Sequence, residues 1–399
     1  MHRYKVPISF LISILTATNL IAAEEYRLIQ RKQLSPDAFL LRFSLPTRVE
    51  IATSSSLPVP TQSTLGPDPT LPTCLSITLP EGTDVYGNGK PTQKDISKSY
   101  SPISHPATRG SFELIVKGYP PKEGGGVGRF LTHYLQVSKS NETLTHHDNL
   151  HANESDVMKN GEDDAMACTD SNSNSERTCS SNDLPFTIEA KLKPPRNVHG
   201  SPTIVGRWNH IGLVAGGTGI APLIQIASLI LNANSKLDPK SSSQEEEEEE
   251  RRTTIHVLYI NRNKQDILYK EQLDRWAKEY PNDFSVSYSL TGNSSTISTS
   301  IDEQEDKEDH YEYLHGRGSG HMAKDALPSP MNTHTNGEKI FTENSMVFVC
   351  GTDGFVKSWG GSIRRAPPKA DGSKGPKIQG PLEGWLKEAG FSAHQVFKY

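Results

Sequence analysis

The feature that most constrains the fold of this 399-residue chain is a glycine-rich turn between an apolar strand and a helix-like stretch. The apolar run Ile211-Gly-Leu-Val214 leads into Ala-Gly-Gly-Thr-Gly-Ile-Ala-Pro222, and a mainly apolar segment follows from Leu223 to Leu231. Such a turn brings backbone N–H groups toward a phosphate at a helix N-terminus, where the helix dipole favours negative charge. By itself the turn has two interpretations: a nucleotide site, or a tight turn that binds nothing.

After this turn, strand-like and helix-like segments alternate. We expect strands at 255–260, 284–290 and 346–350, and helices at 267–280 and 382–389, the last capped by Gly390. Alternation of this kind predicts a parallel sheet covered on both faces. Ligands of such sheets bind beyond the carboxyl ends of the strands, where the turns at Gly216 and Gly351 both fall.

The first third of the chain has a different pattern. Residues 24–137 contain β-prone runs such as 39–45 and 112–117, separated by a loop rich in Ser, Pro and Thr at 54–72. Short strands between turn signals predict a barrel or sandwich.

Three polar inserts interrupt both patterns, at about 138–183, 232–254 and 293–309. They explain the low hydrophobic content of 34%. We expect disorder in the first and an extended loop around the six consecutive glutamates at 245–250, because like charges repel. The four cysteines have no zinc-site spacing, and the net charge of −5 gives no support for nucleic-acid binding. We therefore predict no metal site and no disulfide scaffold.

The N-terminal residues 1–23 are typical of a signal or a membrane anchor. A basic start is followed by an uncharged, mostly apolar run from Val6 to Ala23, at the short edge of what spans a bilayer. Cleavage and retention are both open.

Three motifs occur in a fixed order along the chain: Lys98-Ser-Tyr-Ser-Pro-Ile-Ser104, the glycine-rich turn, and Cys350-Gly-Thr-Asp-Gly-Phe355. Together they resemble the NADH-cytochrome b5 reductase family of the ferredoxin-NADP reductase-like flavoproteins, over roughly residues 25–137 and 184–399. The resemblance implies a two-domain β + α/β fold. An antiparallel FAD-binding β-barrel at 24–205 would be followed by a parallel-sheet, Rossmann-like domain for the pyridine nucleotide at 206–399.

The resemblance also implies which residues bind FAD. Tyr100 would pack against the flavin, and Ser101 would offer a hydrogen bond near flavin N5, where hydride arrives. Closely spaced backbone amides would hold the pyrophosphate. The full implied set is Lys98, Tyr100, Ser101, Pro102, Lys117, Tyr119, Gly126, Val127 and Gly128.

On the nucleotide side, the resemblance places Thr218 in the cleft between flavin and nicotinamide, and Cys350 at the border of the nicotinamide. The catalytic set is thus Ser101, Thr218 and Cys350, and the remaining nucleotide-side residues are Gly216, Gly217, Gly219, Asp266 and Gly351. The Asp266 carboxylate would repel a 2′-phosphate and so favour NADH over NADPH. It could equally be the N-cap of a helix that starts at Ile267.

Several residues have structural interpretations as well. Tyr100 could be a core aromatic, Lys117 a solvated strand residue and Cys350 a buried strand-end thiol. Lys98 stands where the family has Arg, so the positive charge is kept but the bidentate fork is lost. Gly128 replaces the usual Ser, and Thr352 and Asp353 replace prolines.

The implied activity is hydride transfer from NADH to FAD, followed by single-electron transfer to a haem protein such as cytochrome b5. Other acceptors of the ferredoxin or quinone type, or a degenerate flavoprotein fold that acts as a binding module, are the alternatives. We expect a monomer that associates with a membrane through residues 1–23 if that segment is retained. The family resemblance points to the mitochondrial outer membrane or intermembrane space, or to the endoplasmic reticulum, and leaves secretory entry open.

Overall fold

The structure is a computed structural model that describes residues 23–50, 59–85, 89–118, 126–132, 186–237, 252–292, 313–333, 339–341, 344–368, 370, 372 and 375–399. The predicted leader apart from Ala23, the inserts at 138–183 and 293–309, and most of 232–254 lie outside the described residues, as does Tyr119. Within the described ranges, none of the helices has the length and apolar character needed to cross a bilayer.

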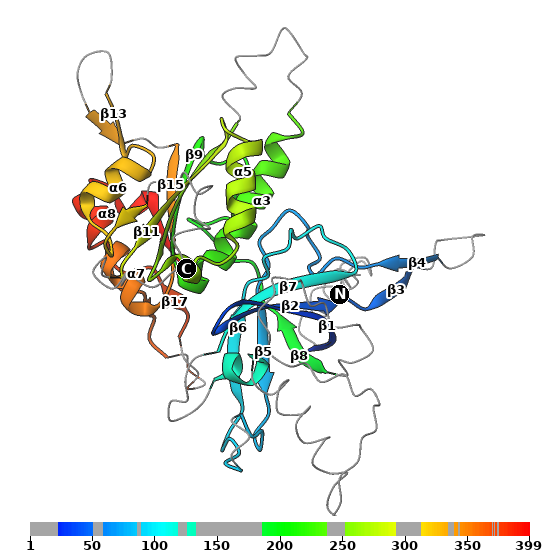
Figure 1. Ribbon diagram of the computed structural model, residues 1–399. Coiled ribbons are helices and arrows are strands. Elements are labelled where there is room, and N and C mark those ends of the chain that lie inside the picture. The colour runs from blue at the N-terminus through cyan, green and yellow to red at the C-terminus, as the bar shows by residue number, and fades with distance from the viewer. Residues whose placement is uncertain are drawn as a thin grey trace, which may run out of the picture.

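An antiparallel sheet of six strands forms the first layer of the fold (Figure 1). Its order is β6-β5-β8-β1-β2-β7, and the backbone N–H of Ile103, just after β6, donates to the carbonyl of Glu113 in β7 at 2.9 Å. This bond joins the two edges and curls the sheet, so the predicted antiparallel β-domain is confirmed. The strands are β1 (Glu24–Ser35), β2 (Ala38–Ser44), β5 (Leu75–Leu79), β6 (Ile96–Tyr100), β7 (Ser111–Lys117) and β8 (Thr187–Leu192), with a side hairpin of β3 (Thr47–Glu50) and β4 (Val59–Gln62).

A parallel sheet of six strands forms the second part, in the order β12-β11-β10-β9-β15-β18. Its strands are β9 (His210–Gly216), β10 (Thr254–Asn261), β11 (Phe284–Leu290), β12 (Leu314–His315), β15 (Ser345–Cys350) and β18 (Val396–Lys398). Two small hairpins accompany it, β13 (Met331–Thr333) with β14 (Lys339–Phe341) and β16 (Arg364–Arg365) with β17 (Lys377–Ile378).

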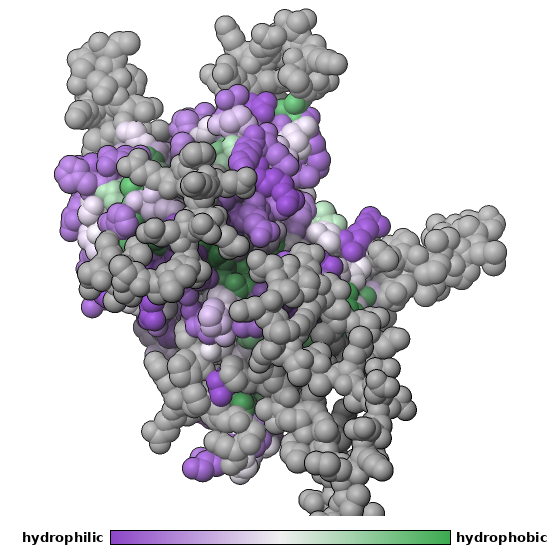
Figure 2. All heavy atoms as spheres, in the orientation of Figure 1, coloured by the Kyte–Doolittle hydropathy of each residue, from purple (hydrophilic) through white to green (hydrophobic). Residues whose placement is uncertain are grey.

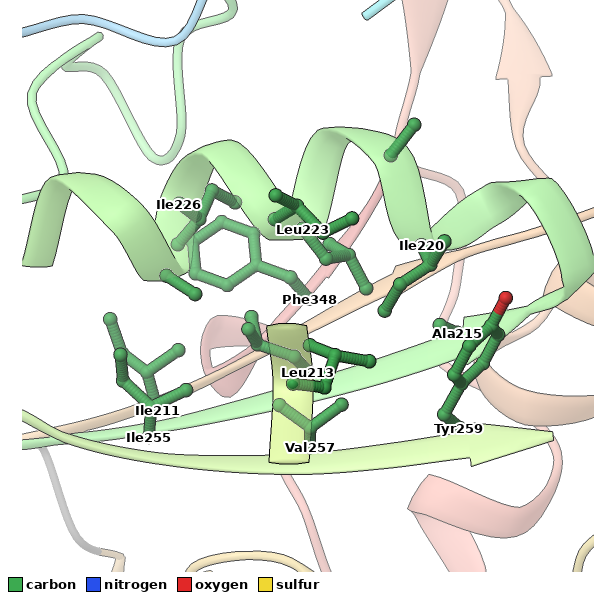
Figure 3. Packing of buried hydrophobic residues seen from close by; sticks show 14 of the residues in the cluster. Ile211, Leu213, Ala215, Ile220, Leu223, Ile226, Ile255, Val257, Tyr259 and Phe348 are labelled. Carbon is green, nitrogen blue, oxygen red and sulfur yellow. The ribbon is translucent and has the colours of Figure 1, made fainter. Parts of the chain in front are cut away.

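Helices cover both faces of the parallel sheet. The side chains of Ile211 and Leu213 in β9 face α3 (Ile220–Asn234) and α5 (Lys270–Glu279), whereas Val214 packs with the other face. That other face is covered by α6 (Gly320–Ala326), α7 (Asp353–Gly360) and α8 (Trp385–Glu388). Figure 3 shows α3 lying over β9 and β10, with Phe348 of β15 between them. Because side chains on a strand alternate, apolar residues at successive positions need apolar neighbours on both sides.

Two helices begin later than their sequence pattern predicts. The helix expected from Ile267 starts at Lys270, because the N–H of Leu268 donates to the buried Tyr259 hydroxyl at 3.3 Å and Tyr269 takes a left-handed φ of +64°. The helix expected from Leu382 starts at Trp385, because the N–H of Glu383 bonds to Gly360. Tertiary hydrogen bonds thus override local helical preference.

The second polar insert is shorter than predicted. Helix α3 continues through Asn234, and β10 begins at Thr254. The Asn234 side chain is buried and exchanges two hydrogen bonds with the backbone of Thr253, at 2.9 and 3.3 Å. This pair fixes the two ends of the insert next to each other.

The antiparallel domain has a hydrophobic core of its own, and a second buried cluster extends across both domains. Ala38, Ile103 and Ile115 of the antiparallel domain belong to the same buried cluster as Ile211 and Leu213 of the parallel domain. Figure 2 shows hydrophobic surface recessed where the two halves meet, and hydrophilic surface over α5. The domains therefore pack by apolar contact, as two halves of one body.

Lys398 of β18 has an unusual environment for a lysine, because it is only 2% exposed. Its ammonium donates to the carbonyls of Gly360, Gly380 and Pro381 at 3.1, 3.2 and 3.0 Å. Burial lowers the pKa of Lys398, yet the three carbonyls satisfy each of its protons. The residue ties the end of α7 to the loop before α8.

We predict that Lys398→Met lowers the free energy of unfolding by about 2–4 kcal/mol, because three buried carbonyls lose a charged donor. Lys387→Met, at an exposed position of α8, is the matched control and should change stability by no more than about 0.5 kcal/mol. Urea unfolding of both variants measures the difference. Equal midpoints for the two would contradict a stabilising role for the buried ammonium.

Candidate functional site

The predicted glycine turn follows β9 directly and forms the short helical turn η2 (Gly217–Gly219) before α3. Gly217 has a φ of +54°, a conformation that favours glycine, and open space lies where its side chain would be. A β-carbon at Gly219 would overlap the carbonyl of Cys350. The turn and the end of β15 therefore touch through backbone alone.

The third motif packs against the same turn through Phe355, the third residue of α7. A β-carbon at Gly216 would lie 2.7 Å from the Phe355 ring, and one at Gly351 would also collide with it. One ring thus fills the space left by two glycines. Thr352 caps α7 by accepting a hydrogen bond from the Phe355 N–H at 3.3 Å, which gives a role to a residue that replaces proline in the family pattern.

Tyr259 of β10 contacts the glycine turn and is fully buried. Its hydroxyl donates to the carbonyl of Gly217 at 3.0 Å and accepts from the N–H of Leu268. Burial raises the pKa of Tyr259 far above its usual range, so it stays a neutral donor. Tyr259 holds the turn and the segment that carries Asp266 in one arrangement.

Asp266 ends the short turn η3 (Lys264–Asp266), which follows β10 at the carboxyl edge of the sheet. The N-cap interpretation is wrong, because α5 begins at Lys270 and Tyr269 occupies the cap position. Asp266 is half-buried, and its backbone N–H donates to the carbonyl of Asn263 at 3.1 Å. The carboxylate is thus placed at the ligand edge without serving α5.

On the antiparallel side, β6 carries Lys98 and ends at Tyr100, whose ring is 8% exposed. The Lys98 ammonium lies 5.5 Å from the centre of that ring. Although the residue surface of Lys98 is exposed, neighbouring chain desolvates the ammonium and lowers its pKa. Ser101 is half-buried and Pro102 is buried, directly after the strand.

Lys117 ends β7, and its ammonium forms an ion pair with Asp37 at 2.9 Å, so it is not a simple solvated residue. Gly126 precedes a short helix over residues 127–132, in which Val127 is buried. A β-carbon at Gly128 would lie 2.6 Å from the Lys117 carbonyl and 3.2 Å from the Tyr100 hydroxyl. The space between Lys117 and Tyr100 therefore admits a glycine at position 128 but not a serine.

The two half-sites meet at the boundary between the domains. Strand β7 lies against the η2 turn. The positive charge of Arg196 acts on the Cys74 and Cys350 thiols and on Tyr399, and its guanidinium lies 4.8 Å from the Tyr399 ring. The Cys74 thiol interacts in turn with Ser101. The structure thus brings Ser101, the glycine turn and Cys350 to one region.

Both thiols in this region are protonated at neutral pH. Burial raises the pKa of Cys350 to about 12, and burial also raises that of Cys74 against the opposing effect of Lys193 and Arg196. A thiol of this kind is a poor nucleophile. Cys350 can line a site and contact an apolar ring, but it is unsuited to covalent chemistry.

Asn261 supplies a further observation that fits a bound nucleotide. It ends β10 at the carboxyl edge and is 5% exposed. Neither polar atom of its side chain makes a well-directed hydrogen bond within the described ranges, although the Tyr259 hydroxyl is close enough to interact. Buried amides are rarely left this way, so the position suits a ligand group. Among the described residues, no acidic, His or Cys cluster could hold a metal.

Sequence reasoning missed Tyr259, Phe355, Asn261 and Gln225 as parts of this region. Phe355 ends the third motif and Tyr259 lies in the strand expected at 255–260, but their roles depend on contacts between segments far apart in the chain. A signal was available for Gln225, since it is one of only two polar residues in the apolar stretch 223–231 and its amide needs a partner when buried.

Comparison with known proteins agrees with this geometry. The family model of an oxidoreductase FAD-binding domain matches residues 70–145, and that of an oxidoreductase NAD-binding domain matches residues 213–359. These two matches show an oxidoreductase with FAD and NADH as cofactors. The chain carries both of these domains, and the predicted likeness to NADH-cytochrome b5 reductases is confirmed.

Individual relatives show how far the likeness extends. NADH-cytochrome b5 reductase 2 of Saccharomyces cerevisiae (strain YJM789) is 26% identical over 310 residues, which are 77% of this chain and 68% of the relative. The protein of the same name from Aspergillus terreus is 30% identical over 200 residues, 50% of this chain and 47% of the relative. The chain therefore spans about two thirds of the first relative and about half of the second.

The crystal structure of the cytochrome b5 reductase domain of Ulva prolifera nitrate reductase has a TM-score of 0.52 and 18% identity to this chain. The match covers 94% of this chain and 97% of that domain. This likeness shows a shared two-domain fold.

We predict that Gly128→Ser, which restores the residue usual in the family, weakens FAD binding by about tenfold, or about 1.4 kcal/mol, because the new side chain collides with Lys117 and Tyr100. Gly126→Ser is the control, since no atom of the described residues lies within 4 Å of its added β-carbon. Fluorescence titration of the apoprotein with FAD measures both. Tighter binding by Gly128→Ser would refute the steric explanation.

Proposed function

We propose that the protein oxidises NADH with a bound FAD and passes the electrons singly to a haem protein of the cytochrome b5 kind. One observation carries the proposal: the glycine turn, Cys350 and the segment after Tyr100 come together between the parallel sheet and the antiparallel sheet. The names of the relatives from yeast and Aspergillus support the same activity.

Bound FAD supplies the redox chemistry, since it accepts a hydride and returns electrons one at a time. The chain itself binds and orients. Tyr100 offers its ring to the flavin, and Ser101 offers a hydroxyl at the end of β6. Lys98 gives the pyrophosphate a cation, while the amides of Gly126, Val127 and Gly128 are close enough in sequence to bind it together.

On the nicotinamide side, β7 lies against the η2 turn that contains Thr218, and the backbone of Gly219 in that turn touches the Cys350 carbonyl with no side chain between them. The buried, neutral Cys350 thiol adds no charge to this region, which favours a site from which water is excluded. No general acid or nucleophile is needed for hydride transfer between two rings. Holding the rings in a near-attack arrangement is the main contribution of the chain to the rate.

The assignment of segments follows the same proposal. Residues 24–205 would form the FAD domain, residues 206–399 the nucleotide domain, and residues 1–23 a membrane anchor or signal. We propose a monomer whose acceptor approaches from outside, at a membrane of the mitochondrion or the endoplasmic reticulum. Sedimentation and fractionation of the full chain test these two points.

We expect purified protein to be yellow, and we expect its flavin absorbance to be lost when NADH is added without oxygen. An anaerobic titration with absorption spectra measures both. Steady-state assays with cytochrome b5, a ferredoxin and a quinone then identify the acceptor. A colourless protein that takes up no added FAD would overturn the proposal.

We predict that Asp266→Ala reduces the preference for NADH over NADPH by about tenfold, because the carboxylate no longer repels a 2′-phosphate. Glu271→Ala removes the same charge from an exposed position of α5 and is the matched control. The ratio of kcat/KM for the two nucleotides measures the effect. An equal shift in both variants would show a general charge effect instead of a specific contact.

A further inference from the structure

A reciprocal pair of hydrogen bonds joins the two domains. The N–H of Thr73 donates to Oε1 of Gln225 at 2.9 Å, and Nε2 of Gln225 donates to the Thr73 hydroxyl at 2.9 Å. The two residues are 152 positions apart, and they are 8% and 1% exposed. We call these two residues the interdomain latch.

The latch lies close in the chain to both half-sites. Gln225 is in the second turn of α3, which begins directly after the glycine turn. Thr73 lies two residues before Leu75, the residue of β5 that pairs with Tyr100 in β6. The two hydrogen bonds therefore link the backbone that carries the nicotinamide side to the backbone that carries the flavin side.

We propose that Gln225 is a positioning residue that fixes the spacing between nicotinamide and flavin. The inference rests on the proposed function and deepens it. Apolar packing alone holds two domains together but tolerates sliding, because it has no preferred direction. Two hydrogen bonds in opposite directions fix both the distance and the angle between α3 and the segment before β5.

The surroundings of Gln225 favour this role. Its neighbours along α3, Ile224 and Ile226, are fully buried, so an apolar residue would satisfy the core at this position. A buried amide is tolerated because Thr73 pairs with both ends of it. On the other side, the methyl of Thr73 packs on Gly66, where an added β-carbon would lie 3.0 Å away. The latch is thus held from both domains.

Hydride transfer is sensitive to such a constraint. A misplacement of about 1 Å between reacting groups can lower a rate by about 100-fold. The latch does not touch the reacting atoms, so its loss should leave the binding of each cofactor nearly intact. Its loss should instead widen the range of distances between the two rings.

The test uses the FAD-loaded full chain and compares Gln225→Met with Thr73→Ser. Gln225→Met keeps the unbranched shape and loses both hydrogen bonds, whereas Thr73→Ser keeps the N–H and the hydroxyl that Gln225 needs. Rapid mixing with saturating NADH measures flavin reduction, with NADH and with NADH deuterated at the transferred position. The long-wavelength absorbance of the stacked rings is recorded in the same experiment.

We expect flavin reduction to slow by about 10-fold to 100-fold in Gln225→Met, with a changed isotope effect and a weaker long-wavelength band. The Kd for NADH should change little. Thr73→Ser keeps both hydrogen bonds, so its rate, isotope effect and band should match the wild type, while loss of the methyl that packs on Gly66 should lower only its stability, and slightly. If Gln225→Met does not fold, Thr73→Val, which keeps the N–H and loses the hydroxyl, should show the same changes to a smaller degree.

Two other results overturn the inference in distinguishable ways. If the wild type binds FAD but NADH does not reduce it, the proposed function fails, and the positioning role fails with it. If the wild type is reduced and Gln225→Met loses only thermal stability, with unchanged rate, isotope effect and band, the latch is structural and the proposed function stands.

Discussion

The site depends on Gly219 lying directly against the carbonyl of Cys350. This contact sets the spacing between the ends of β9 and β15, and Phe355 fills the space over Gly216 and Gly351. Packing therefore requires the glycines of both motifs, whether or not they also let the backbone approach a phosphate. The two interpretations of the turn, nucleotide site and tight turn, are compatible because a turn this close-packed also leaves its backbone open toward the ligand edge.

A second constraint comes from the way in which the domains join. The shared apolar cluster holds the domains together, and the hydrogen bonds of the interdomain latch, Thr73 and Gln225, fix their relative orientation. Tyr259 plays a comparable part within the nucleotide domain, since it connects the glycine turn with the segment of Asp266. Polar side chains that are buried and fully paired thus occur where the geometry of the site has to be held, while the surrounding core is apolar.

The sequence allowed the fold to be predicted in most of its elements, and the site only in its motifs. Strand 284–290 and the glycine turn stand where their patterns placed them, because local periodicity and the demand for burial agree there. The predicted start of α5 was wrong because the N–H of Leu268 bonds to the hydroxyl of Tyr259 in β10 and so lies outside the helix. The contacts of Gln225 and Phe355 could not be predicted, for the same reason. Gln225 pairs with Thr73, 152 residues away, and the Phe355 ring packs on Gly216, which belongs to β9.

The shared core has a consequence for cooperativity. Inter-domain contacts are often polar and permit independent melting, but Ala38, Ile103 and Ile115 belong to a buried apolar cluster that extends into the other domain. Separating the two sheets would expose apolar surface on both, so neither half gains by unfolding alone. Heat should therefore melt the chain in a single transition despite its two domains. A substitution that destabilises the parallel sheet should also destabilise the antiparallel sheet, even when it lies far from the cofactors.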